Sequence, residues 1–269
     1  MIGRLIAALR RAPRGYALPP RLRVYAVGDV HGRADLLAGL HRRVAADAAG
    51  FLSADPSHRV EIVHLGDYID RGPDPAGVLD LIARPWPDRF SVVNLKGNHE
   101  AALLAFLDSP GLETAGWLDF GGLETLIAYG VRPDPALPPE PRLRAIRDGL
   151  AAVLAPRHLA LLRGLTPWHR VGDYWFVHAG VDPSRPLEAQ EEADLLWRRP
   201  AAAPPPRAPA GRVVHGHTVT REPEILPHRI GIDLGAYATG RLAAVALEAA
   251  APPRILVEDG GLPVTAPGY

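Results

Sequence analysis

The sequence contains no cysteine in its 269 residues. Disulfide bonds and thiolate metal sites are therefore excluded. Any metal site in this chain must use nitrogen and oxygen ligands, a donor set that suits Mn, Fe, Zn or Mg better than soft metals.

The chain also lacks an excess of charge of either sign, because 30 Lys and Arg residues balance 30 Asp and Glu residues. Nucleic-acid-binding proteins usually carry a basic surplus or a basic face, so we expect no nucleic-acid partner. No apolar run approaches the roughly 20 residues that a membrane-spanning helix needs. We therefore expect a cytoplasmic protein without a transmembrane segment, and the sequence leaves its oligomeric state open.

Residues 1–20 form a basic stretch that contains Arg4, Arg10, Arg11 and Arg14. This stretch lacks the longer apolar run and the small-residue cleavage site of a secretory signal. We interpret it as a poorly ordered arm. The alternative is a basic amphipathic segment that touches a membrane surface or a partner.

Strand and helix patterns alternate along the rest of the chain. Apolar, β-branched runs that stop at Gly or Asp predict buried strands at 22–27, 60–65, 90–95, 174–177, 212–215, 230–233 and 242–247. Helical spacing of apolar residues predicts helices at 34–49, 75–83, 100–107, 123–129, 143–154, 156–162 and 188–196. This alternation indicates an α/β layered domain. Two segments rich in proline and alanine, 132–142 and 200–209, are expected to be surface loops.

Five short polar motifs follow the predicted strands: GDVHG at 28–32, GDYIDRG at 66–72, GNHE at 97–100, HAG at 178–180 and HGHT at 215–218. Loops at the carboxyl ends of strands converge on one crevice in α/β proteins, so these motifs are expected to meet. Because they lie on both sides of each proline-rich loop, we expect residues 21–269 to form a single catalytic domain.

The residue types in these motifs suit a metal centre. Asp29 and His31 alternate, so in an extended segment their side chains share one face. The carboxylate of Asp67 offers two oxygens and could bridge two metals, and Arg71 could hold a phosphate through its planar fork of donors. Each motif alone has a structural alternative, for example a surface turn closed by an Asp70–Arg71 pair. Five such motifs in order favour a functional metal centre.

Together the motifs resemble the phosphoprotein phosphatase family of the metallophosphoesterase superfamily, and most closely its prokaryotic serine/threonine phosphatases. The resemblance spans roughly residues 23 to 236 and includes Trp117-Leu118 and the stretch from Gly121 to Leu126. It implies a central β-sandwich flanked by helices, with a dimetal site at the strand-end loops. It also implies two divalent ions, for which we expect Mn²⁺, with Fe, Zn or Mg as alternatives.

The resemblance further implies a role for each motif residue. Asp29 and His31 would bind the first metal, Asp67 would bridge both, and the second metal would be held by Asn98, His178 and His217. His99 would be the general acid, oriented by Asp70. Arg71 and a second arginine from a W-x-R pattern would bind phosphate; Arg199 is our choice and Arg198 the reserve. His215 is assigned no metal, and the remaining histidines are interpreted as structural or surface residues: His41, His58, His64, His158, His169 and His228.

The implied reaction is hydrolysis of a phosphomonoester by a hydroxide that bridges the two metals. Phosphoserine and phosphothreonine in proteins are the preferred substrates, because no aromatic-rich basic segment indicates a pocket for a nucleotide base. The first alternative is symmetrical hydrolysis of dinucleoside tetraphosphates, an activity of a prokaryotic enzyme that shares these motifs. A nuclease is disfavoured by the neutral charge. A non-catalytic phosphate-binding module is disfavoured by the complete set of candidate ligands.

Overall fold

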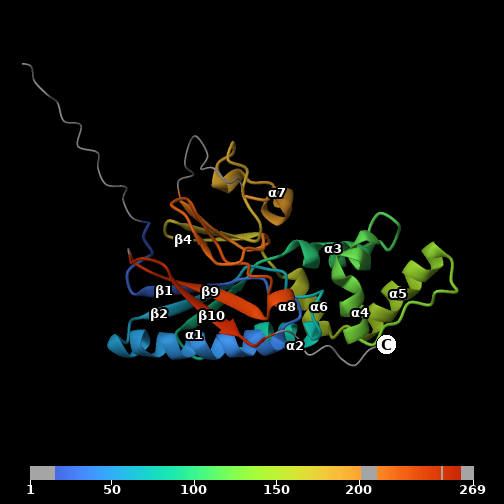
Figure 1. Ribbon diagram of the computed structural model, residues 1–269, viewed down its shortest axis with the longest axis horizontal. Helices are drawn as coiled ribbons and strands as arrows, with labels where there is room; N and C mark the ends of the chain where they lie inside the picture. The colour runs from blue at the N-terminus through green and yellow to red at the C-terminus, as the bar shows by residue number, and fades with distance from the viewer. Residues whose placement is uncertain (1–15, 201–210, 250, 262–269) are drawn as a thin grey trace, which may run out of the picture.

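The computed structural model describes residues 16–200, 211–249 and 251–261, which form two stacked sheets with helices on the outer faces (Figure 1). The first sheet has the strand order β10 (Arg254–Asp259), β9 (Arg241–Glu248), β1 (Leu22–Val27), β2 (Arg59–His64) and β3 (Phe90–Asn94). The second has the order β4 (Trp168–Val171), β5 (Tyr174–Val177), β6 (Arg212–His215), β8 (Arg229–Gly231) and β7 (Glu224–Ile225). The predicted α/β sandwich is therefore confirmed.

Each sheet contains three adjacent parallel strands. β1, β2 and β3 run parallel in the first sheet, and β5, β6 and β8 run parallel in the second. β9 pairs with β1 in antiparallel orientation, and β10 pairs with β9 in the same way. The carboxyl ends of the parallel strands, where the five motifs begin, consequently lie along one end of the sandwich.

Six helices form a layer that begins on the outer face of the first sheet and continues to one side of it (Figure 1). They are α1 (Ala34–Ala54), α2 (Pro75–Ala83), α3 (Asn98–Asp108), α4 (Leu123–Ala128), α5 (Pro139–Val153) and α6 (Pro156–Arg163). A π-helical turn, η1 (Leu118–Gly122), joins directly to α4. A 3-10 turn, η2 (Leu187–Ala189), and α7 (Glu192–Trp197) cover the second sheet, while α8 (Ala236–Thr239) precedes β9.

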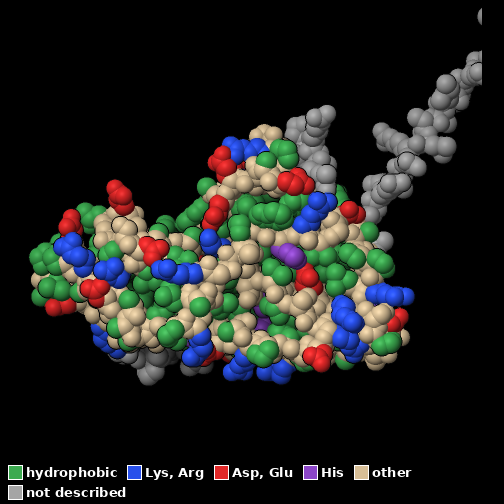
Figure 2. All heavy atoms as spheres, turned by 180° about the vertical axis from the view of Figure 1, so that it is seen from behind, with side chains coloured by type: hydrophobic (Ala, Val, Ile, Leu, Met, Phe, Trp, Pro, Cys, Tyr) green, Lys and Arg blue, Asp and Glu red, His purple; other side chains and the backbone are tan. Residues whose placement is uncertain are grey.

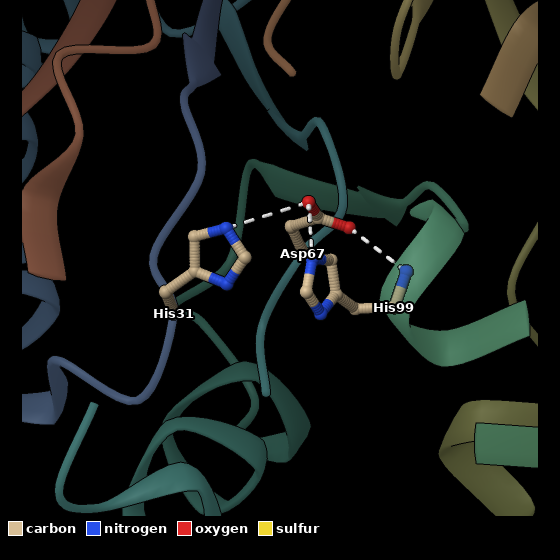
Figure 3. A group of neighbouring side chains, drawn as sticks. All are labelled: His31, Asp67 and His99. Carbon is tan, nitrogen blue, oxygen red and sulfur yellow. Dashed lines mark hydrogen bonds and ion pairs between the residues drawn. The ribbon is translucent and has the colours of Figure 1, made fainter. Parts of the chain in front are cut away.

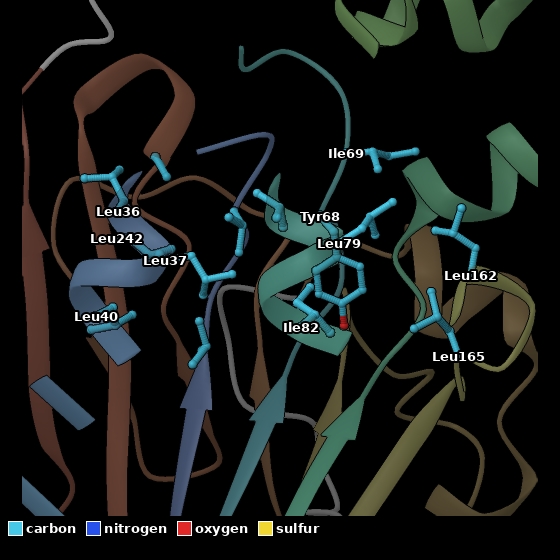
Figure 4. Packing of buried hydrophobic residues seen from close by; sticks show 14 of the residues in the cluster. Leu36, Leu37, Leu40, Tyr68, Ile69, Leu79, Ile82, Leu162, Leu165 and Leu242 are labelled. Atoms are coloured by element: carbon cyan, nitrogen blue, oxygen red, sulfur yellow. The ribbon is translucent and has the colours of Figure 1, made fainter. Parts of the chain in front are cut away.

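Side-chain alternation along the central strand explains the layering. On β1, Tyr25 and Val27 enter the large cluster between the first sheet and the helices, whereas Val24 and Ala26 enter the cluster between the sheets. Figure 4 shows part of the larger cluster, in which leucines of α1 and α2 pack over the strands. Because β1 is apolar on both faces, it is buried by both layers.

Several predicted elements differ from the structure. α5 begins at Pro139, inside the predicted loop 132–142, because proline is favoured in the first turn of a helix. The predicted helix 188–196 is broken into η2 and α7 by extended backbone at Gln190 and Glu191. The Gln190 side chain stabilises the break, since its Oε1 accepts from the Asp182 N–H at 2.6 Å. Strands β4, β7 and β10 and the short α8 were not predicted.

Most of the basic arm and most of the second proline-rich loop, namely residues 1–15 and 201–209, lie outside the described residues. The rest of the arm packs on the sandwich, because Leu18 is buried between the sheets and its N–H donates to the Ala249 carbonyl at 3.1 Å. Among the described residues, no helix combines the length and apolar character needed to cross a bilayer.

Candidate active site

The predicted ligands come together at the carboxyl ends of the parallel strands. Asp29 and His31 follow β1, Asp67 follows β2, Asn98 and His99 open α3 after β3, and His178 and His217 follow β5 and β6. All are buried except His217, which is half-buried. Side chains separated by up to 188 positions in sequence therefore share one cluster, as the Asp29–His217 hydrogen bond illustrates.

The Asp67 carboxylate lies at the centre of this cluster. Its Oδ2 is 3.4 Å from His31 Nε2 and 3.8 Å from His99 Nε2 (Figure 3). Its Oδ1 is 3.4 Å from His178 Nε2 and also accepts from the His99 backbone N–H at 3.2 Å. We call the group around Oδ2, with His31 and His99, the first half of the centre, and the group around Oδ1 the second half.

The second half contains a compact set of nitrogen and oxygen donors. His178 Nε2 lies 2.9 Å from Asn98 Oδ1 and 3.2 Å from His217 Nδ1. The distance between His217 Nδ1 and Asn98 Oδ1 is 3.0 Å. Three donors and Asp67 Oδ1 thus converge on a space of the size that one cation requires.

Backbone carbonyls fix the tautomers of His31 and His178, which are both buried. Nδ1 of His31 lies 2.9 Å from the Ile69 carbonyl, and Nδ1 of His178 lies 2.9 Å from the Leu65 carbonyl. Each Nδ1 must therefore carry the proton and donate, which leaves the Nε2 lone pair directed at Asp67. Burial lowers the pKa of both rings, that of His31 to about 3, so both are neutral and able to ligate at neutral pH.

The Asp29 carboxylate contacts the loop that carries His217. Its Oδ2 accepts from the His217 backbone N–H at 2.8 Å, and its buried Oδ1 has no hydrogen-bond partner. His99, and not Asp29, completes the group formed with His31 and Asp67. A Cβ at position 216 would collide with this carboxylate, which explains the glycine there.

The donor chemistry fits divalent cations. Burial, followed by the neighbouring carboxylates of Asp233 and Asp67, raises the pKa of Asp29 well above its usual value. Three buried carboxylates beside neutral imidazoles form an excess of negative charge that a cation would balance. The unpartnered Oδ1 of Asp29 and the unprotonated Nε2 atoms of His31 and His178 are suitable ligands for such an ion.

His99 and Asp70 form a buried pair next to the cluster. His99 Nδ1 donates to Asp70 Oδ2 at 2.7 Å, and its Nε2 faces Asp67. Burial alone would lower the pKa of His99, but the negative charges of Asp67 and Asp70 outweigh it and raise that pKa. The ring is thus positioned to carry and donate a proton.

Three arginines were candidates for phosphate binding, and their surroundings differ. Arg71 donates from Nη1 to His31 Nε2 at 2.9 Å and lies over the Tyr237 ring at 4.9 Å. Arg198 is paired with Asp194 at 2.7 Å, so its charge is engaged. Arg199 is exposed, and its charge contributes to the lowered pKa of His217, whose largest cause is burial. Arg198 and Arg199 thus differ in that the Arg198 guanidinium is held by a neighbouring carboxylate.

Backbone strain is concentrated at the candidate site. Eight described residues other than glycine have positive φ angles, and five of them are candidate site residues: His31 (43°), Asp67 (52°), Asp70 (70°), Arg71 (66°) and His217 (59°). Such angles are unfavourable for side-chain-bearing residues and cluster at functional sites. No pattern in the sequence identifies these angles, because tertiary hydrogen bonds impose them.

One supporting residue, Glu100, has no role in the predicted site. It accepts backbone N–H groups from Asp67 at 2.9 Å and Tyr68 at 2.8 Å as well as from Gly97 at 2.9 Å. It therefore ties the Asp67 loop to α3. Its place in the GNHE motif was the available signal. His215 lies beside the cluster, and its two ring nitrogens contact the Gly216 carbonyl and Arg229.

The chain is similar to known phosphoesterases. It is 39% identical over 101 residues to serine/threonine-protein phosphatase 2 of Escherichia coli (strain K12); this alignment covers 37% of the chain and 38% of that protein. It is 22% identical over 236 residues to an asymmetrical bis(5'-nucleosyl)-tetraphosphatase, PrpE, of Bacillus thuringiensis (strain Al Hakam), covering 81% and 88% of the two chains.

A solved structure has a similar fold. It belongs to a protein proposed to be a diadenosine tetraphosphatase, with a TM-score of 0.56 and 23% identity over 91% of this chain and all of the other. The profile of the calcineurin-like phosphoesterases matches residues 22–240, which include every predicted ligand. This agrees with the motif resemblance, and the Escherichia coli relative supports its phosphoprotein phosphatase branch. The chain is a phosphoester hydrolase and belongs to the calcineurin-like phosphoesterase family.

Proposed function

We propose that this protein is a metal-dependent phosphatase that hydrolyses phosphoserine and phosphothreonine in proteins. The observation that carries the proposal is the position of the Asp67 carboxylate, whose two oxygens face two separate groups of ligands. A carboxylate so placed is suited to bridge two ions. Similarity to serine/threonine-protein phosphatase 2 over 37% of the chain supports the choice of substrate.

In this proposal Asp29, His31 and Asp67 hold one ion, and Asp67, Asn98, His178 and His217 hold the other. Asp29 reaches the first ion through its unpartnered Oδ1. The chemistry that two such ions supply is neutralisation of phosphoryl charge and activation of a water molecule. We expect manganese, because carboxylate, amide and imidazole ligands suit it and the resemblance implies it.

The remaining residues act on the phosphate and the leaving group. Arg71 and Arg199 hold the phosphoryl oxygens and stabilise the charge that develops on them. His99, protonated because Asp67 and Asp70 raise its pKa, gives its proton to the departing alkoxide. Asp70 keeps the His99 ring oriented through the 2.7 Å hydrogen bond to Nδ1. No covalent phosphoenzyme is required.

A second candidate substrate is a dinucleoside tetraphosphate, and one observation favours it. Phe120 of η1 and Trp197 of α7 bring their rings to a centroid distance of 6.2 Å, and their exposed fractions are 48% and 45%. Phe120 accepts from Arg71 through its carbonyl, and Trp197 lies two positions before Arg199. Exposed rings beside phosphate-binding arginines could stack on a nucleobase.

Metal dependence tests the proposed chemistry. We would strip the protein with a chelator and measure hydrolysis of p-nitrophenyl phosphate with and without Mn²⁺, beside Asp67→Asn and the exposed control Asp148→Asn. Activity that Mn²⁺ restores in the wild type and in the control, but not in Asp67→Asn, is expected. Equal activity of all three proteins without metal would contradict the proposal.

Substrate preference is tested separately. Phosphoserine peptide and diadenosine tetraphosphate would be compared at equal concentration with wild type and Trp197→Leu. A higher kcat/KM for the peptide, unaffected by Trp197→Leu, is expected for a protein phosphatase. A higher kcat/KM for the dinucleotide that falls on loss of the ring would favour the second candidate. Charges of both signs are mixed over the face seen in Figure 2.

A further inference from the structure

One helical segment, residues 117–125, makes close contacts with the Asp70–Arg71 pair although it is about 50 positions away in sequence. Trp117 precedes η1, and Thr125 lies in α4. Both side chains are buried, with 1% of their surfaces exposed. The proposed function assigns neither residue a role.

The contacts satisfy every oxygen of the Asp70 carboxylate. Trp117 Nε1 donates to Asp70 Oδ2 at 2.9 Å, sharing that oxygen with His99 Nδ1 at 2.7 Å. Thr125 Oγ1 donates to Asp70 Oδ1 at 2.6 Å. The same hydroxyl accepts from the Asp70 backbone N–H at 3.0 Å. Asp70 itself is completely buried, so no water competes for these positions.

The segment also holds the neighbouring arginine. Arg71 N–H donates to the Gly121 carbonyl at 3.1 Å, and Arg71 Nε donates to the Phe120 carbonyl at 3.3 Å. Gly121 has a φ of 108°, and a Cβ there would lie 2.6 Å from Cγ of Arg71. A side chain at position 121 is thus excluded by both strain and space, which allows the segment to approach Arg71 closely.

We propose that Trp117 and Thr125 are positioning residues for the general acid: they lock the Asp70 carboxylate in the one orientation that aims His99 Nε2 at the reacting phosphate. The inference rests on the proposed role of His99. With one oxygen held by the indole and the other by the hydroxyl, the carboxylate cannot rotate about its terminal bond. Its hydrogen bond to Nδ1 therefore fixes both the tautomer and the direction of the His99 ring.

The hydroxyl has a second effect on the backbone. Asp70 adopts a φ of 70°, an unfavourable angle for a residue with a side chain. The N–H contact to Thr125 Oγ1 compensates for part of that strain. Loss of the hydroxyl would release the carboxylate and the backbone together, whereas serine would keep both contacts. Threonine, serine and valine at position 125 consequently form a matched series.

The kinetic test compares leaving groups. A poorly aimed general acid slows esters of alkyl alcohols, which need protonation, more than esters of p-nitrophenol, which does not. For Thr125→Val and Trp117→Phe we expect kcat on a phosphoserine peptide to fall about 10-fold, with less than about 2-fold change on p-nitrophenyl phosphate. Thr125→Ser is expected to match the wild type on both substrates. Trp168→Phe, which removes a half-exposed indole on β4, controls for loss of tryptophan.

A second measurement needs neither metal nor turnover. The His99 Nδ1 proton, held against Asp70 in a buried site, is expected to give a low-field NMR signal in ¹⁵N-histidine-labelled protein. We expect Thr125→Val to lose this signal through exchange and Thr125→Ser to keep it. The assignment is made by its disappearance in His99→Asn.

The outcomes separate this inference from the proposed function. Equal losses on both substrates, together with an unchanged NMR signal, would mean that the segment is merely structural and would overturn the inference. If the wild type hydrolyses p-nitrophenyl phosphate but no phosphoserine peptide, the proposed substrate is wrong. In that case the NMR series still decides whether Thr125 positions the pair.

Discussion

The two halves of the candidate centre share the Asp67 carboxylate but differ in how complete they are. In the second half, Asn98, His178 and His217 already lie within 3.2 Å of one another through their ligand atoms. In the first half, the Nε2 lone pair of His31 accepts a hydrogen bond from Arg71 at 2.9 Å. Asp29 is directed toward the His217 backbone.

This difference indicates that the second half is preorganised and the first half is not. A cation that binds His31 must displace the Arg71 guanidinium from Nε2, which frees that group for an incoming phosphate. Ligands fixed in advance lose less conformational freedom on binding and bind more tightly. We therefore expect the second half to hold its ion more strongly, and the first three predictions below test this comparison.

The largest effects are expected from removing one ligand in each half. His178→Ala should abolish binding of the tightly held ion, and His31→Ala should abolish binding of the weakly held ion. Each variant should lose more than about 100-fold in activity, because the loss of a residue that only hydrogen-bonds to a ligand already costs up to about that much. Metal content by mass spectrometry after dialysis measures the difference. Equal retention of metal by the two variants would contradict the asymmetry.

Replacement of His99 tests whether this residue is a metal ligand of the first half or a general acid. His99→Asn is expected to keep both ions and to lower kcat for an alkyl phosphate about 100-fold or more, because proton donation typically contributes that much. The decrease for p-nitrophenyl phosphate should be smaller. Loss of an ion in this variant would instead make His99 a ligand, as its distance to Asp67 permits.

Arg71→Ala should separate substrate binding from metal binding. Removal of a charged donor is expected to raise KM for phosphate esters about 10-fold. The same change exposes the His31 lone pair, so affinity for the weaker ion should stay equal or increase. A titration with Mn²⁺ followed by kinetics checks both values. A parallel loss of metal affinity would show that Arg71 supports the first half and does not block it.

The smallest effect on turnover is expected from a histidine pair remote from the cluster. His41 Nε2 and His64 Nε2 lie 3.0 Å apart, and burial lowers their pKa values to about 3 and about 4 from 6.5. As the pH falls below 6.5, these histidines bind protons in the unfolded chain at a higher pH than in the folded protein. The free energy of unfolding should therefore decrease as the pH falls from 6.5 toward 4.

Unfolding by urea at pH 7 and pH 5 measures this dependence in the metal-free protein. His41→Gln is expected to reduce the difference between the two pH values and to leave activity at pH 7 unchanged. An identical pH dependence in the variant would show that His41 does not contribute.

Much of the site was predictable because its candidate ligands lie in short sequence motifs. Asp67, His99 and His178 each follow an apolar run, and the convergence of strand ends made their meeting predictable. The orientation of Asp29 was not, because it depends on the His217 backbone 188 positions away. Likewise α5 was predicted to start too late, since the proline signals of 132–142 were interpreted as a loop and not as a helix start.

The sequence by itself determined the α/β layering, the set of candidate nitrogen and oxygen ligands and their place after the strands, because hydrophobic periodicity and residue chemistry are local properties. The tertiary structure alone decided the left-handed backbone at Asp70, the contacts of Trp117 and Thr125 with it, the pairing of Arg71 with His31 and the contact of Phe120 with Trp197. These features join segments that are distant in the chain, and only packing of the whole domain fixes their distances and the burial that shifts their pKa values.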